Sequence, residues 1–186
     1  MLSSFISFPT RWAWMVLLFL VSQPENPDFS VPLPRRDTVF AHLDIKPGSC
    51  PNPVNAMHGL VAGEDALLAA VVPVTLLGNK FDVTFVDLGS IGMRRADVGL
   101  SGGVVFPFNF SYEDTASPFT GDLCDCHELH GDGILDLNMK FDRAELVSIL
   151  ELDEEDNGAM VPLVLTALTG EQGLLMGYDC VRVINH

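Results

Sequence analysis

Residues 122–141 read DLCDCHELHGDGILDLNMKF and decide the fold, because an acidic, glycine-punctuated loop runs here without a break into a period-two apolar pattern. The apolar members of that pattern alternate with polar residues, and they are Leu135, Leu137, Met139 and Phe141. Such alternation predicts a strand with one buried and one solvated face. A loop crowded with carboxylates that feeds a strand is an arrangement that a divalent cation stabilises.

The loop follows the spacing of a calcium loop of the D-x-[DN]-x-D-G-x-x-D kind. In such loops the oxygen ligands are spaced two residues apart along the first part of the motif, and a glycine, here Gly133, permits the sharp turn. The sequence therefore predicts a calcium site with the ligands Glu128, His130, Asp132, the carbonyl of Ile134, and Asp136, to which Asp125 or Asp122 adds oxygens.

Two alternatives to calcium remain open, because half of the loop departs from that pattern. Glu128 is one methylene longer than aspartate, His130 offers nitrogen, and Met139 stands where an EF-hand has its bidentate glutamate. One alternative is a plain turn whose aspartates bond local amides. The other is a zinc or copper site with the donors Cys124, Cys126, His127 and His130. A metalloprotease is excluded, since HELH lacks the second histidine of an H-E-x-x-H helix.

The four cysteines, Cys50, Cys124, Cys126 and Cys180, allow three pairings in an oxidising compartment. Cys124 and Cys126 are too close in sequence to bridge without strain. We expect Cys50 to pair with one of them, which would tie the acidic loop to the end of the first strand. The alternative is a chain with two or more free thiols.

The N-terminal region predicts export. Residues 12–21, WAWMVLLFLV, form the longest apolar run, which is too short to span a bilayer comfortably and fits the apolar region of a secretory signal. We expect a signal peptide or an uncleaved N-terminal anchor over residues 1–22, a proline-rich linker over 23–36, and a single β-domain over 37–186. The expected location is secreted, periplasmic or at the cell surface, with no membrane insertion beyond the N-terminal segment.

Short strands and one helix make up the predicted domain. Strands are expected at 37–45, 66–77, 81–86, 104–112, 135–141, 161–169 and 178–184, although the first half of 66–77 also suits a short helix. Asp142 is expected to cap a helix over 143–150. Several short strands with turn signals between them predict an all-β fold, an antiparallel β-sandwich with one short helix.

The composition excludes some partners. The chain has 186 residues and a formal net charge of −15, so nucleic acid and anionic membrane surfaces would be repelled. Cations are the natural counterpart of such a charge. A solvated acidic surface that keeps an exported protein soluble explains the total charge equally well.

Four ordered motifs carry a resemblance to a known domain. They are HLDIKPGSCPNPVN, VVPVTLLGNKFDVTFVD, YEDTASPFTGDLCDCHELHGDGILDLNMKFD, and LTALTG followed by GYDCVRVI. In these the chain resembles a recurrent domain of secreted and cell-surface bacterial and archaeal proteins. The resemblance implies an all-β module, often part of larger exported proteins, with a calcium loop that includes Asp132 and Asp136. Cys50, Cys124 and Cys126 match a variant of that domain, whereas His130 and the insert at 57–70 depart from it.

These features lead to two expected functions. The first is a non-catalytic, calcium-stabilised module for surface display, adhesion or matrix assembly. The alternative is a carbohydrate-binding or accessory module of an extracellular hydrolase, so the expected partner is an extracellular polysaccharide or a surface protein. Exposed aromatics would favour sugar binding, but the alternating stripe Phe106, Phe108, Phe110 and Tyr112 is more typical of a core face. Catalysis is not expected, because the sequence has no nucleophile motif such as G-x-S-x-G.

Overall fold

The computed structural model describes residues 38–57, 71–118, 120–127, 130–170 and 173–185. The predicted leader, the predicted linker and most of the insert lie outside these ranges. The strands are β1 (Thr38–Ile45), β2 (Pro53–Asn55), β3 (Val71–Leu76), β4 (Val86–Arg95), β5 (Asn109–Glu113), β6 (Asp136–Asp142), β7 (Met160–Thr169) and β8 (Gly173–Ile184). The helical elements are α2 (Arg143–Ile149) and the 3-10 turns η1 (Val83–Phe85), η2 (Gly99–Ser101) and η3 (Leu152–Glu154).

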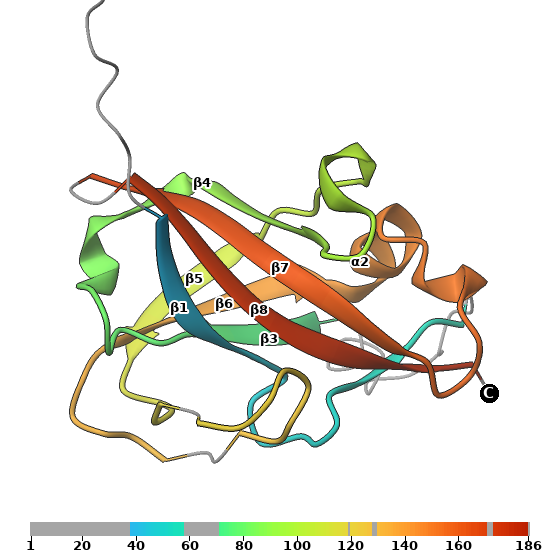
Figure 1. Cartoon of the computed structure of the whole chain (residues 1–186), viewed down its shortest axis with the longest axis horizontal. Helices are drawn as coiled ribbons and strands as arrows, with labels where there is room; N and C mark the ends of the chain where they lie inside the picture. Colours follow the sequence, from blue (N-terminus) through green and yellow to red (C-terminus); the bar gives the residue numbers. More distant parts are fainter. Residues whose placement is uncertain (1–37, 58–70, 119, 128–129, 171–172, 186) are drawn as a thin grey trace, which may run out of the picture. The chain divides into compact units, whose positions relative to one another are not determined.

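The predicted all-β fold with one short helix is confirmed for the described residues. The strands form one sheet in the order β4-β7-β8-β1-β3-β6-β5, with β2 also paired to β8, and the sheet curls strongly into a half-barrel (Figure 1). It is therefore not a clear sandwich. It is also mixed rather than purely antiparallel, because β1 and β2 both run parallel to β8.

Strand β1 changes partner halfway along its length, which joins the two parts of the curled sheet. Its first five residues pair with β8, and its last three pair with β3. Where β1 leaves β8, the carboxylate of Asp179 takes over the missing ladder bonds. Its Oδ2 accepts from the backbone N–H of Ile45 at 2.7 Å and from Nδ2 of Asn52 at 3.0 Å. Asn52 also donates to the carbonyl of Cys180 at 2.9 Å, and β2 then resumes the pairing with β8.

The core lies on the inner face of the curled sheet. The alternation predicted for β6 is confirmed for Leu137, Met139 and Phe141, which are fully buried, whereas Leu135 precedes the strand and is 50% exposed. Helix α2 adds Leu146 and Val147 to this core. Its predicted cap is also present, because Oδ1 of Asp142 accepts from the N–H of Glu145 at 2.9 Å. Each fully buried side chain of this size contributes about 1.5–3 kcal/mol of transfer free energy.

Two strand predictions are wrong in their bounds. The segment 81–86 begins as η1 rather than as a strand, because Oδ1 of Asp82 accepts from both the N–H and the hydroxyl of Thr84. The segment 104–112 becomes a strand only from Asn109. Before it, Val105 makes an isolated bridge to Met93.

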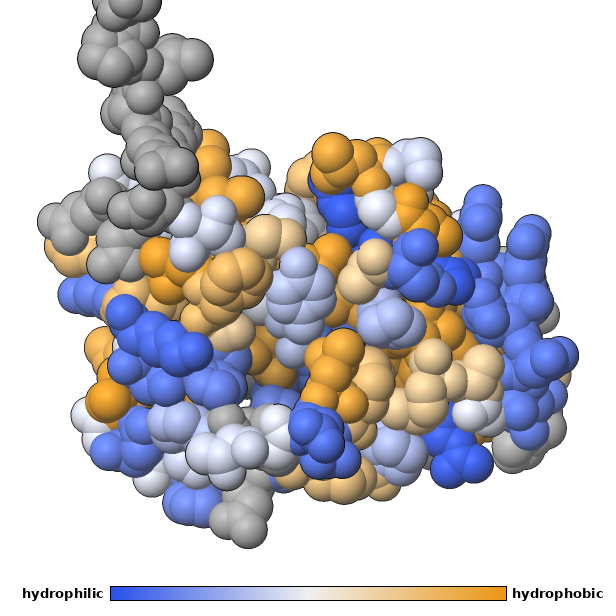
Figure 2. All heavy atoms as spheres, in the orientation of Figure 1, coloured by the Kyte–Doolittle hydropathy of each residue, from blue (hydrophilic) through white to orange (hydrophobic). Residues whose placement is uncertain are grey.

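The outer face of β7 and β8 shows apolar side chains between polar ones (Figure 2). Phe40 of β1 and Tyr178 of β8 are exposed there, with their rings stacked at a centroid distance of 6.5 Å. In the described part of the chain, no helix is long and apolar enough to cross a membrane.

Candidate functional site

The acidic loop between β5 and β6 is held by a carboxylate that the sequence analysis missed. Oδ1 of Asp114 accepts from the N–H of Asp132 at 2.9 Å, and Oδ2 accepts from the N–H of Gly133 at 2.8 Å. Asp132 in turn accepts from the N–H of Ile134 at 3.0 Å. Gly133 has φ +90°, so the predicted glycine bend is present. Of these contacts, the bond between Asp132 and Ile134 is of the local kind expected for a plain turn, whereas the other two amides are held by Asp114 from 18 and 19 residues away.

Asp136, at the start of β6, is buried and fastens three chain segments together. It is 1% exposed. Its Oδ1 accepts from the N–H of Gly78 at 3.2 Å, and its Oδ2 accepts from the N–H groups of Thr115 and Ala116 at 2.9 and 3.0 Å. The chain after β3 approaches so closely that a Cβ on Gly78 would lie 2.1 Å from the carbonyl oxygen of Leu135. Asp136 is thus a buried anchor that receives three amides.

The predicted calcium ligands do not come together in the described part. Oδ2 of Asp125 accepts from the N–H of Asp122 in a separate turn, at 2.9 Å. His130 is exposed, with its Nε2 at 3.3 Å from the hydroxyl of Ser117. Glu128 lies outside the described residues. Among the residues that the structure does describe, no three His, Cys, Asp or Glu side chains gather into a metal-binding group. They do not fit the donor set expected for calcium, and the calcium site stays a prediction.

All four cysteines are in disulfides. Cys50 pairs with Cys126 and Cys124 pairs with Cys180, with Cα atoms 5.4 and 4.9 Å apart. The prediction that Cys50 joins one of the two neighbouring cysteines is confirmed, and the free-thiol alternative is wrong. Oxidised sulfur cannot act as a thiolate ligand, so the zinc or copper site loses two of its four donors. The acidic loop is tied both to the turn after β1 and to β8.

The disulfide from Cys124 ties the loop to Cys180 of β8, next to the buried Asp179. Burial and then repulsion by His42 of β1 lower the pKa of His127. In the same sheet, Asp44 of β1 and Asp179 of β8 are each 1% exposed, and Oδ2 of Asp44 has no hydrogen-bond partner among the described residues. Burial and then repulsion by Asp179 raise the pKa of Asp44 to about 7. Burial raises the pKa of Asp179 to about 6, although three hydrogen bonds favour its charged form.

These two carboxyl groups predict that stability falls as pH rises. Both have folded pKa values above the unfolded value of 3.8, so the folded chain binds more protons between about pH 4 and pH 7. Their contribution is fully present only below the unfolded pKa of 3.8 and is lost progressively as pH rises to between 6 and 7. We expect Asp44→Asn, which imitates the protonated acid, to gain stability relative to wild type as pH rises over this range. Urea unfolding at pH 4, 5.5 and 7 measures it, with the exposed Asp87→Asn as the control. Parallel profiles for wild type and Asp44→Asn would contradict the expectation.

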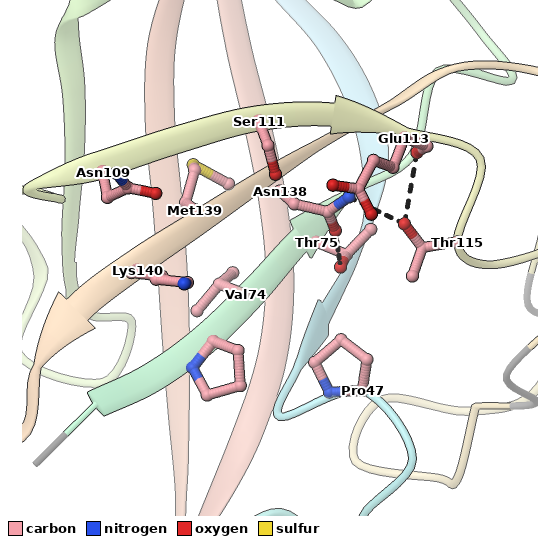
Figure 3. Close-up of a pocket in the computed structure, with 11 residues that line it drawn as sticks. Pro47, Val74, Thr75, Asn109, Ser111, Glu113, Thr115, Asn138, Met139 and Lys140 are labelled. Carbon is pink, nitrogen blue, oxygen red and sulfur yellow. Dashed lines mark hydrogen bonds between the residues drawn. The ribbon is translucent and has the colours of Figure 1, made fainter. Parts of the chain in front are cut away.

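A groove lined by both polar and apolar residues lies on the outer face of β3, β6 and β5 (Figure 3). Residues that are direct cross-strand partners point their side chains to the same face of the sheet. The strand register therefore places three rows of side chains on this face: Pro73, Lys140 and Asn109; Thr75, Asn138 and Ser111; and Asp136 with Glu113. The groove has a volume of about 380 Å³. Lys140 and Asn109 lie at one end, and Glu113 and Thr115 lie at the other (Figure 3).

The floor of the groove is a chain of hydrogen bonds. The hydroxyl of Thr75 donates to Oδ1 of Asn138 at 2.5 Å, and Nδ2 of Asn138 donates to the hydroxyl of Thr115 at 2.7 Å. That hydroxyl donates to the carbonyl of Glu113 at 3.1 Å. The network fixes the orientation of the Asn138 amide before any ligand arrives.

The aromatic stripe is mostly exposed, and its members Phe110 and Tyr112 lie on the face of β5 opposite to the groove. Phe110 is partly buried against the core, as expected. Phe106, Phe108 and Tyr112 are 57%, 60% and 39% exposed, so the expected core stripe does not hold for them. Exposed aromatics are the feature that the sequence analysis associates with sugar binding.

No family model, no curated protein and no solved structure matches this chain. The resemblance to the recurrent exported domain therefore stays a prediction.

Proposed function

We infer that this chain is an exported, non-catalytic β-domain that binds an extracellular ligand and functions in surface display, adhesion or matrix assembly. The observation that carries the proposal is the groove on β3, β6 and β5, whose floor is already fixed by hydrogen bonds. A preformed groove of mixed lining, with a few polar groups held in place, is typical of ligand binding.

The two disulfides support export. They are typical of proteins that work in oxidising compartments, outside the cytosol. They close segments of 76 and 56 residues and hold the long β5–β6 loop against the sheet. A secreted or surface-attached protein gains most from such fastening, because it works without chaperones or reductants.

The carboxylates beside the groove support binding rather than hydrolysis. Glycoside hydrolases of the common type need two carboxyl groups that both reach the substrate. Glu113 lines the groove, and its cross-strand neighbour is Asp136. Both oxygens of Asp136 are already bonded to backbone amides in a buried position. Of this pair, only Glu113 can reach a ligand, and a single accessible carboxylate fits a residue that contacts the ligand better than a catalytic pair.

The second candidate is an accessory module of an extracellular hydrolase. It is favoured by the exposed rings of Phe106, Phe108 and Tyr112, because such modules hold polysaccharide against exposed aromatics. The two candidates differ in the surface that meets the ligand, the groove in the first and the exposed rings in the second, and in what the chain is attached to.

Retention on immobilised polymers tests the proposal. The full chain, exported through an oxidising secretory route and labelled, is applied to a panel of polysaccharides and to a panel of matrix and cell-surface proteins. We expect retention on at least one polymer, at least a tenfold loss with Asn109→Ala/Ser111→Ala, and no release of product. Equal retention of the double variant, failure to bind any polymer, or turnover of the bound polymer would each contradict it.

A further inference from the structure

We propose that the groove on β3, β6 and β5 binds a neutral saccharide, an inference that rests on the proposed function and names its ligand. Four side chains at the groove carry it. Asn109, Ser111, Glu113 and Lys140 all line the groove. None of their side chains has a hydrogen bond or ion pair within the described part of the chain. They are therefore available to a ligand without breaking any contact of the fold.

The mixture of groups matches sugar hydroxyls. Each hydroxyl of a sugar both donates and accepts a hydrogen bond. An amide, a hydroxyl, a carboxylate and an ammonium group together offer both roles within one site. Asn109 is the cross-strand partner of Lys140, and Glu113 lies four residues further along the same strand as Asn109. At about 3.3 Å per residue, the backbone positions of Glu113 and Lys140 are about 13 Å apart along the strands. That length suits a short oligosaccharide.

Other ligand classes fit the same groove less well. A phosphate or an acidic polymer would meet one lysine on a chain of net charge −15, and a cation would meet that lysine as well. An apolar ligand would leave polar groups without partners, at about 1–3 kcal/mol for each one that becomes buried.

A peptide added as an extra strand cannot use the groove floor. Strand β6 is paired on both sides, to β3 and β5, and β3 is paired to β1 and β6. The backbone of β6, at the centre of the floor, is therefore committed to the sheet, and a peptide strand could pair only along the outer edge of β5, the last strand in the order, where it would lie beside the floor. A ligand that is itself rich in hydroxyls is best matched to such a floor.

The groove is also rigid, so that several weak contacts with a ligand can together give a measurable affinity. The bonds from Thr75 to Asn138 and from Asn138 to Thr115 hold the floor. Pro47 and Pro73 border it with rings that have few conformations to lose. A site with little conformational entropy to lose binds more tightly for the same contacts.

Calorimetry with defined sugars tests the inference on the full exported chain. The probes are the tetrasaccharides of cellulose, xylan, mannan and chitin, with an oligogalacturonate and a surface-protein peptide panel as the other arms. We expect one or more neutral tetrasaccharides to bind, with at least a tenfold weaker affinity for Asn109→Ala and for Lys140→Ala. Lys80→Ala, which removes an exposed lysine elsewhere, and Phe108→Ala should bind as wild type does.

Each other outcome overturns the inference in a recognisable way. If the groove binds a protein or an acidic sugar and no neutral sugar, the proposed function stands and the assignment of a neutral saccharide as its ligand is wrong. Sugar binding lost in Phe108→Ala and kept in Asn109→Ala would move the site to the aromatic stripe. Failure of every arm to bind would remove both proposals. Unfolded variants are recognised by their melting curves, and Asn109→Asp and Ser111→Thr then replace the alanine variants.

Discussion

Asp136→Ala should lower the free energy of unfolding by about 3 kcal/mol or more, the first of the two largest effects expected for this chain. Three backbone N–H groups, from Gly78, Thr115 and Ala116, lose their acceptor. A buried donor left without a partner costs about 1–3 kcal/mol, and some of the three will recover water. Urea unfolding of the purified variant measures the loss. Asp114→Ala, which frees two amides of the exposed turn, is the matched control and should lose less.

The same variant separates the amide anchor from the predicted calcium site. If Asp136 acts by accepting hydrogen bonds from backbone amides, Asp136→Ala loses the same free energy of unfolding in excess calcium and in chelator. If it holds a cation, wild type gains stability with calcium, about 2.7 kcal/mol at a hundredfold excess over the dissociation constant, and the variant does not. The contacts in the structure predict the equal loss.

Removal of either disulfide should cost about 4 kcal/mol, the second of the two effects. The cross-link restricts the unfolded chain by an amount that grows slowly with the closed segment. On this basis the stabilisation from closing a segment of 76 residues exceeds that from closing one of 56 residues by only about 0.3 kcal/mol. Cys50→Ala/Cys126→Ala and Cys124→Ala/Cys180→Ala should therefore lose nearly the same stability, each serving as the control for the other.

Urea unfolding without reductant measures these losses, and peptide mapping without reduction checks that the remaining pair is intact. A disulfide variant as stable as wild type would contradict the expectation. So would a map that joins Cys50 to Cys124.

The sequence predicted those features that depend on local signals. The period-two pattern of β6, the cap at Asp142 and the bend at Gly133 each arise from residues within a few positions of one another. The pairing of Cys50 with one of two neighbours followed from the strain of the alternative.

Features that depend on strand register were not predictable from one sequence. The change of partner within β1 follows from which strands lie beside it, and nothing in DTVFAHLDI marks the point at which it occurs. The burial of Asp44 likewise depends on which strands lie beside β1.

The groove and the loop anchors were missed for the same physical reason. Thr75, Asn138 and Ser111 share one row only because β3, β6 and β5 pair in this register. Asp114 reaches the bend from 18 residues away, a separation that no local motif encodes. The crowded acids drew attention to metal binding, whereas their oxygens are satisfied mainly by amides.

The most direct measurement of ligand binding in the groove follows its side-chain amides by nuclear magnetic resonance during a titration with the neutral tetrasaccharide panel. The proposal predicts that the Nδ2 resonances of Asn109 and Asn138 move together as one sugar saturates the site, while that of Asn185, bonded to the carbonyl of Glu155, stays in place. Unmoved resonances of Asn109 and Asn138 throughout the panel would contradict it.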